Sequence, residues 1–180
     1  MSILNNLKVT RAAYDELPLV QNIVFRCGEQ VLARHGTRVW LPEIPLDILR
    51  RQSLDRSFWL VWYENLPVAT LSTSVTCPDY CAGDSFDDTR PGIYIGKLAV
   101  LPDWQSRGIG SWCRIWAEAF AREGKFGWLR LDVLIEHPDV VQWYVDRGFG
   151  RIGEAVVADW QERRWNLVLL EKSVNDGRDI

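Results

Sequence analysis

The sequence predicts a mixed α/β fold with one central sheet, and two observations support this prediction. β-rich apolar segments recur along the whole chain, and helical segments with an apolar stripe separate several of them. The chain has 180 residues, of which 47% are apolar, so it can bury a sizeable core. Because no repeat, low-complexity tract or linker interrupts it, we expect a single domain over residues 1–180.

In the first half of the chain, a short strand precedes two helices and a hairpin. Apolar residues at three- and four-residue spacing predict the first helix, and Gly36 is suited to end it. The expected elements are a strand at 7–11, helices at 15–34 and 46–54, and strands at 58–64 and 68–76. The stretch between the two helices is broken by prolines and is expected to be a loop that carries specificity.

The second half begins with a long polar loop at 78–92 and continues with alternating strands and helices. An apolar stripe predicts a helix at 108–123, and Pro138 and Gly148 bracket a shorter helix at 138–147. The remaining expected strands are 93–101, 128–135 and an antiparallel closing pair at 151–158 and 165–171.

The composition argues against several classes of partner. With 21 basic and 24 acidic residues the net charge is −3, so there is no electrostatic reason to expect nucleic acid or an anionic membrane. The four cysteines and two histidines lack the spacing of a zinc or redox motif, so we expect no metal. We see no secretory signal or membrane span, and we expect a cytoplasmic protein.

The most informative segment is a strand followed by a short break and the glycine-bearing start of a helix, near residue 108. A helix N-terminus presents free backbone N–H groups and a partial positive charge. Gly108 and Gly110 let phosphate oxygens approach that backbone, and Arg107 adds a cation. The segment matches neither a P-loop nor a dinucleotide fingerprint. It is either a phosphate-binding turn or a helix cap without a ligand.

Two motifs in this half of the chain resemble the Gcn5-related N-acetyltransferases, the GNAT superfamily. Residues 105–110, Gln-Ser-Arg-Gly-Ile-Gly, are similar to the family signature Gln/Arg-x-x-Gly-x-Gly/Ala. Residues 137–149 resemble the family's later helix, with Tyr144 in place and with His137 where the family usually has Asn. The resemblance covers about residues 8–172.

The resemblance implies a mostly antiparallel sheet flanked by helices, with one splayed parallel pair of strands at about 95–100 and 129–135. It also implies that the pantetheine arm of acetyl-CoA lies between these two strands and that the glycine-bearing turn binds the pyrophosphate. The implied cofactor-binding residues are Leu98, Ala99, Val100, Gln105, Ser106, Arg107, Gly108, Ile109, Gly110, His137 and Tyr144.

Tyr144 is also the implied general acid, because a phenol with a pKa of about 10 can donate a proton to the departing sulfur. A packing role in the short helix is the alternative for this side chain. The general base stays open, because the strand from residue 93 carries no acid. Glu136 is our candidate. The alternatives are Asp132, His137 and a bound water. Glu43 and the acids between residues 79 and 88 could instead help to bind a cationic amine.

We therefore expect an acetyl-CoA-dependent N-acetyltransferase that acts by direct transfer on the primary amine of a small molecule. The first alternative is a protein or peptide N-acetyltransferase of the same fold. The second is an acyl-CoA-binding module with little catalysis, motivated by the missing strand acid and by His137. The protein is expected to be a monomer or a homodimer. Its ten tryptophans either pack in the core or line a pocket.

Overall fold

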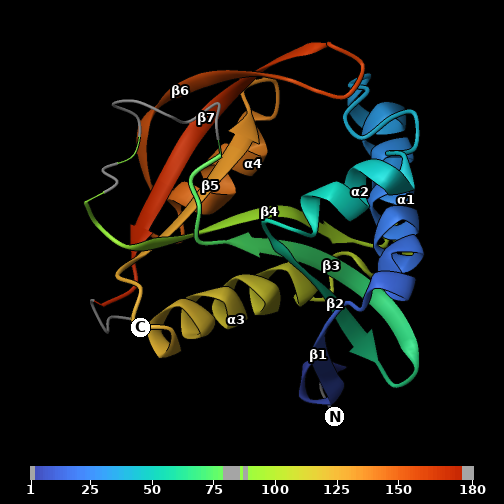
Figure 1. Cartoon of the computed structure of the whole chain (residues 1–180), viewed down its shortest axis with the longest axis horizontal. Coiled ribbons are helices and arrows are strands. Elements are labelled where there is room, and N and C mark those ends of the chain that lie inside the picture. The colour runs from blue at the N-terminus through green and yellow to red at the C-terminus, as the bar shows by residue number, and fades with distance from the viewer. Residues whose placement is uncertain (1–2, 79–85, 87–88, 176–180) are drawn as a thin grey trace. The chain divides into compact units, whose positions relative to one another are not determined.

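The computed structural model describes residues 3–78, 86 and 89–175, and it confirms the predicted mixed α/β class (Figure 1). In chain order its elements are η1 (Ile3–Asn6), β1 (Leu7–Arg11), η2 (Tyr14–Glu16), α1 (Leu17–His35), α2 (Leu46–Gln52), β2 (Ser57–Tyr63), β3 (Leu66–Ser74), β4 (Gly92–Val100), η4 (Pro102–Trp104), α3 (Ile109–Glu123), β5 (Trp128–Leu134), α4 (Pro138–Val145), β6 (Gly150–Ala158) and β7 (Arg164–Ser173).

The described strands form one mixed sheet in the order β1-β2-β3-β4-β5-β7-β6. Strands β1, β2 and β3 pair antiparallel, as do β5, β7 and β6. Strands β4 and β5 pair in parallel, with a register that runs from Gly92↔Trp128 to Tyr94↔Arg130. Among the described residues, the pairing of β4 with β5 ends at Tyr94, whereas β4 itself continues to Val100. The predicted combination of antiparallel pairs with one parallel pair is therefore confirmed.

The chain forms two compact units, which we describe separately. The first unit comprises residues 1–73 and 97–116, and the second comprises 74–96 and 117–180. Strand β4 and helix α3 each begin in one unit and end in the other, so the backbone passes between the units within regular elements.

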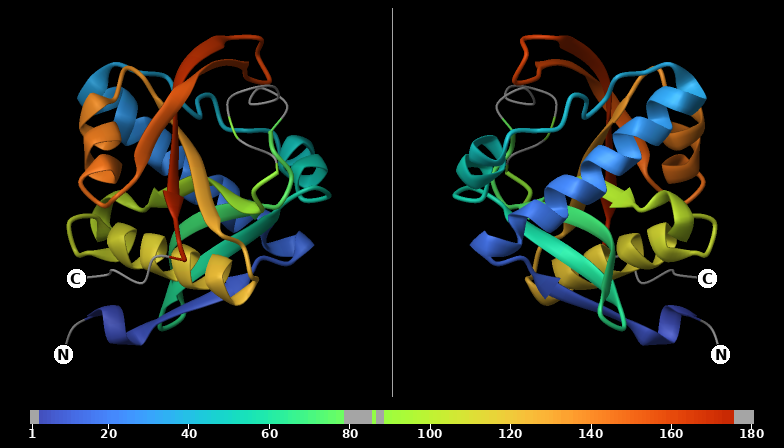
Figure 2. Two further views of the ribbon diagram at one scale, coloured as in Figure 1. Left: turned by 90° about the vertical axis from the view of Figure 1, so that its left-hand side faces the viewer. Right: turned by 90° about the vertical axis from the view of Figure 1, so that its right-hand side faces the viewer.

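Helix α1 packs against β2, and Figure 2 shows the helix crossing the strands of the first unit. The buried residues of α1 are Leu17, Val20, Ile23, Val24, Cys27 and Gly28. Position 28 favours glycine, because a Cβ atom there would lie 2.8 Å from the Val39 carbonyl oxygen. The loop after α1 therefore packs directly on the helix backbone.

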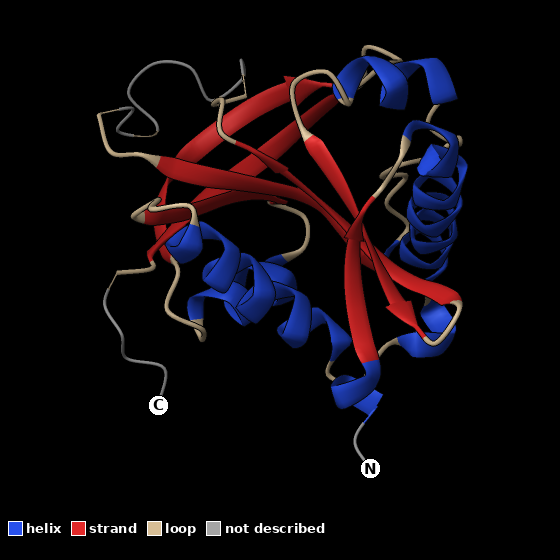
Figure 3. Ribbon diagram, turned by 60° about the horizontal axis from the view of Figure 1, so that its bottom comes forward, coloured by secondary structure: helices blue, strands red, loops and turns tan. Residues whose placement is uncertain are grey.

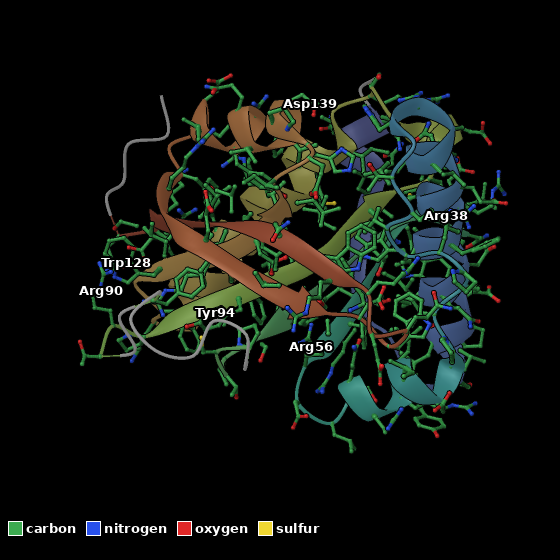
Figure 4. All side chains as sticks on the ribbon, turned by 90° about the horizontal axis from the view of Figure 1, so that it is seen from above. Arg38, Arg56, Arg90, Tyr94, Trp128 and Asp139 are labelled. Carbon is green, nitrogen blue, oxygen red and sulfur yellow. The ribbon has the colours of Figure 1, made fainter. Side chains whose placement is uncertain are left out.

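The second unit contains a buried network around Arg130, whose side chain is only 1% exposed. Its Nε atom lies 3.3 Å from Glu171 Oε2, and its Nη1 atom donates to the Tyr94 hydroxyl at 2.8 Å. Arg90 pairs with the same carboxylate at 2.8 Å and stacks on Trp128 (Figure 4). Arg130 on β5 is thus part of a buried ion-pair and hydrogen-bond network.

Several boundaries differ from those predicted. The helix expected from residue 15 starts as η2, where Glu16 accepts a hydrogen bond from the Ala13 N–H, and α1 begins only at Leu17. Helices α2 and α4 end earlier than predicted, and β7 extends to Ser173. Residues 79–85 and 87–88 of the predicted loop, including its four aspartates, lie outside the described residues. None of the described helices is long and apolar enough to cross a membrane.

Candidate active site

The predicted phosphate-binding turn lies in the first unit, between η4 and α3. The first hydrogen bond of α3 runs from the Trp112 N–H to the Gly108 carbonyl, so the N–H groups of the first turn have no acceptor within the helix. Ser106 and Gly108 both adopt left-handed backbone conformations, with φ of 60° and 84°. Such residues bring successive N–H groups to one side of a turn, which makes a concave anion site. The geometry therefore fits a phosphate group.

The two glycines of this turn differ in their conformation and surroundings. Gly108 has a positive φ, which a residue with a side chain adopts only at a cost. Gly110 has no positive φ, and a Cβ atom built on it would meet no atom within 4 Å. The space beside Gly110 is therefore open in the described structure.

Arg107 supplies positive charge to the turn, and an aromatic ring holds it there. Its guanidinium lies 5.0 Å from the centroid of the Trp104 ring, which in turn packs at 5.1 Å against Tyr63. Stacking orients the guanidinium and leaves its N–H groups free to bind anions. The side chains of Ser106 and Arg107 are exposed, as a ligand-binding turn requires.

Gln105 is half-buried, and its side chain forms a hydrogen bond within the protein. Its Nε2 atom donates to the Val100 carbonyl oxygen at 2.9 Å, which ties the turn back to the end of β4. Cys27 on α1 donates its thiol to the same oxygen at 3.1 Å. Sequence reasoning missed this role of Cys27, because a single cysteine on a helix carries no motif. Both side chains position the strand end from which the turn starts.

The backbone direction of β4 bears on the predicted contacts of the pantetheine arm. The Leu101 N–H donates to the Val68 carbonyl of β3 at 2.9 Å. Since backbone groups alternate between the two edges of a strand, the N–H groups of Leu98 and Val100 point away from β3. Both residues thus present N–H groups on the edge where the resemblance places the arm. Ala99 is buried with the core.

The second unit contains the other three predicted site residues. Tyr144 is buried on α4, where its ring packs edge-to-face against Trp143 at 4.8 Å and Phe149 at 5.2 Å. His137 is the buried N-cap residue of α4, and its carbonyl accepts the N–H groups of Val140 and Val141. Glu136 is exposed in the turn after β5. The two aromatic contacts fix the orientation of the Tyr144 ring.

Two other acids were candidates, Asp132 as the base and Glu43 for binding a cationic amine, and they differ in exposure. Glu43 is exposed in the loop before α2, and Asp132 is half-buried on β5. Within the described residues, no three histidine, cysteine, aspartate or glutamate side chains gather as metal ligands would.

Comparisons with known proteins add to this geometry. The model of the acetyltransferase (GNAT) family matches residues 29–150. The ribosomal-protein-alanine N-acetyltransferase from Brucella melitensis has a similar structure, with a TM-score of 0.64, 18% identity, and coverage of 92% of this chain and 99% of that one. A spermidine N-acetyltransferase chimera from Vibrio cholerae and hSSAT gives a TM-score of 0.65 at 13% identity, with coverage of 94% and 96%. A GNAT family acetyltransferase from Elizabethkingia anophelis with acetyl-CoA bound gives 0.62 at 12% identity, with coverage of 94% and 99%.

At these identities the structural likeness shows the fold. No curated protein matches the chain by sequence.

Proposed function

The chain belongs to the acetyltransferase (GNAT) family, and from this premise we propose that it moves an acetyl group from acetyl-CoA to the primary amine of a small molecule. The observation that carries the proposal is the turn before α3, with its left-handed residues, its open space over Gly110 and its stacked Arg107. These features together suit the pyrophosphate of coenzyme A better than an unliganded helix cap, which needs neither the open space nor the arginine.

Binding in this proposal uses mainly backbone groups. The N–H groups at the start of α3 and the Arg107 guanidinium hold the pyrophosphate, and the N–H groups of Leu98 and Val100 hold the amides of the arm. Gln105 acts indirectly, because its bond to the Val100 carbonyl fixes the strand end relative to the turn. Positioning the thioester in this way can supply much of the rate enhancement.

The chemistry needs one proton acceptor and one proton donor. Acetyl-CoA supplies an activated thioester, whose carbonyl carbon forms a bond to the amine nitrogen as the carbon–sulfur bond breaks. Glu136 accepts the proton that the amine loses, directly or through water. Tyr144 donates its phenolic proton to the departing sulfur, and its packing between Trp143 and Phe149 keeps the ring in one orientation.

Calorimetric titration with acetyl-CoA tests the cofactor and its site. Gly110→Glu is a sharper variant than one at Gly108, because Gly110 has open space and no positive φ. The new carboxylate should repel the pyrophosphate and weaken binding about a hundredfold. Gly153→Glu is the matched control, since Gly153 also has open space around it and lies on β6. If the folded wild-type protein fails to bind acetyl-CoA, the proposal is wrong.

An acceptor screen then tests the reaction. Free amines and an alanine-terminated peptide are compared with acetyl-CoA as donor, and turnover of the peptide alone would contradict the small-molecule assignment. Tyr144→Phe keeps the ring packing but removes the acid, so kcat should fall about a hundredfold while acetyl-CoA affinity stays unchanged. Tyr63→Phe removes a phenol from another packed tyrosine and should leave kcat as it is.

A further inference from the structure

The first unit contains a cavity of about 330 Å³ that no predicted site residue lines. It lies where β1 ends, α1 and β2 begin and α2 has just ended. Its polar lining includes two guanidinium groups and three hydroxyl groups, and Phe58 contributes an aromatic surface. The side chains that matter here are those of Arg11, Tyr14, Ser53, Arg56, Ser57 and Phe58. Its volume is sufficient for a small molecule.

Among the described residues, those that line this cavity include two arginines and no acid. Arg11 and Arg56 (the latter labelled in Figure 4) both line it, no carboxylate lines it, and neither guanidinium has an ion pair within the described residues. The nearest acids in the sequence, Asp15 and Asp55, do not line the cavity, and two further acids have other partners. Glu16 accepts the Ala13 N–H at 2.8 Å, and Asp47 lies 3.4 Å from Arg51. Two unpaired guanidinium groups on one cavity are suited to a carboxylate or a phosphate.

Two further cations lie near aromatic rings of residues that line the cavity. The Arg50 guanidinium lies 4.9 Å from the centroid of the Tyr14 ring, and the Lys97 ammonium lies 5.9 Å from that of Phe58. Lys97 directly precedes Leu98 on β4, so Phe58 is in contact with the residue before the strand segment that we propose binds the pantetheine arm. The cavity and this segment belong to the same compact unit.

We infer that the acceptor amine also carries an anionic group, a carboxylate or a phosphate, and that this group binds between Arg11 and Arg56. The inference that the acceptor is an amine rests on the proposed function. The inference that it carries an anionic group rests on the cavity. The anion would be held by the two guanidinium groups and by the hydroxyl group of Ser57, because the Ser53 hydroxyl already donates to the Arg50 carbonyl at 2.7 Å. The apolar part of the molecule would lie on Phe58.

Matched acceptor pairs test this inference. Tyrosine is compared with tyramine, tryptophan with tryptamine, and phosphoethanolamine with ethanolamine, by steady-state acetylation. In at least one pair, the anionic member should have a kcat/KM at least about tenfold higher. Arg56→Gln and Arg11→Gln should each remove this preference, mainly through KM. Arg51→Gln is the control, because Arg51 is exposed on α2 and does not line the cavity.

A direct binding measurement separates failure of the inference from failure of the proposed function. Benzoate and inorganic phosphate are titrated into the protein in the presence of coenzyme A, and the backbone amide signals of Tyr14 and Ser57 are followed by NMR. Shifts at these amides that Arg56→Gln abolishes and Arg51→Gln retains would support the anion site even if no amine is acetylated. An absence of shifts with either probe, or amine turnover without preference for the anionic members, would overturn the inference and leave the proposed function standing.

Discussion

At the scale of single residues, Val100 connects the strand and the turn. Its carbonyl oxygen accepts hydrogen bonds from Gln105 at 2.9 Å and from Cys27 at 3.1 Å. The glycines, Arg107 and the helix start were recognisable from the sequence, because they are neighbours along the chain. The Cys27 contact was not, since it joins residues that are close only in the folded protein.

Gln105→Leu should weaken acetyl-CoA binding about tenfold, because the turn loses its tie to β4, and should cost about 1 kcal/mol of unfolding free energy. Gln21→Leu is the matched control, since Gln21 also donates Nε2 to a backbone carbonyl, that of Ile44, at 2.7 Å. The control should cost similar stability but leave the affinity unchanged. Calorimetry measures the acetyl-CoA affinity of both variants, and urea denaturation measures their stability. Equal losses of affinity in the two variants would contradict a positioning role for Gln105.

Burial raises the pKa of the Cys27 thiol from 9.0 to about 12, against a smaller lowering by Arg26. The folded protein therefore keeps this proton between about pH 9 and about pH 12, while the unfolded chain releases it. The unfolded state binds fewer protons there, so stability falls as the pH rises, by about 1.4 kcal/mol per pH unit from this group. Cys27→Val should show a flatter decline than the wild type in urea unfolding at alkaline pH. Parallel slopes would show that Cys27 does not contribute.

At the scale of elements, the β6–β7 hairpin is closed by the carboxylate of Asp159, at its tip. Asp159 Oδ2 accepts from Arg163 Nε at 2.8 Å and from Trp165 Nε1 at 3.0 Å. Its Oδ1 accepts the backbone N–H groups of Gln161 and Arg163. The two long strands of this hairpin are visible in Figure 3. One side chain thus organises the whole turn.

The same network gives the hairpin a pH dependence. Burial alone would raise the pKa of Asp159, but the hydrogen bonds from Arg163, Trp165 and two backbone N–H groups outweigh it and lower the pKa. The stabilisation is complete above the ordinary value of 3.8 and is lost as the pH falls through the folded-state pKa. As the pH falls below about 3.8, the wild type should lose stability relative to Asp159→Asn.

NMR of the Trp165 indole N–H, with urea unfolding, measures this loss. Asp146→Asn, at the C-cap of α4, is the control for a carboxylate that accepts a hydrogen bond from one side chain, that of Gln142. If wild type and Asp159→Asn respond alike to acid, the carboxylate network does not stabilise the hairpin.

The element boundaries show which structural features can be predicted from local sequence patterns and which cannot. The strand at 7–11 was predicted residue for residue, and α3 to within one residue, because periodicity and glycine signals are local. The start of α1 was misplaced, because Tyr14–Glu16 closes into a 3-10 turn capped by Glu16 before the α-helix begins at Leu17. The hydrogen bond between Glu16 and the Ala13 N–H stabilises a local turn at this point. The spacing of apolar residues carries no information about such a bond.

At the scale of the whole molecule, we propose that the two compact units fold as one domain. Strand β4 and helix α3 each pass from one unit to the other, so neither unit can unfold without breaking an element of the other. Urea unfolding followed by far-UV circular dichroism and by tryptophan fluorescence should give one coincident transition. Saturating acetyl-CoA should shift both signals together to higher urea. Two separate transitions would contradict the proposal.

The sequence by itself determined the class of fold, the order of the elements and the place of the glycine-bearing turn that we propose binds phosphate, because these depend on periodicity, glycine spacing and helix ends within short stretches of chain. Only the tertiary structure decided which distant side chains meet. It joined Arg130 to Glu171, Cys27 to Val100, and Arg11 and Arg56 around one cavity. Such contacts depend on how separate strands and helices pack, and no local pattern in the chain records that packing.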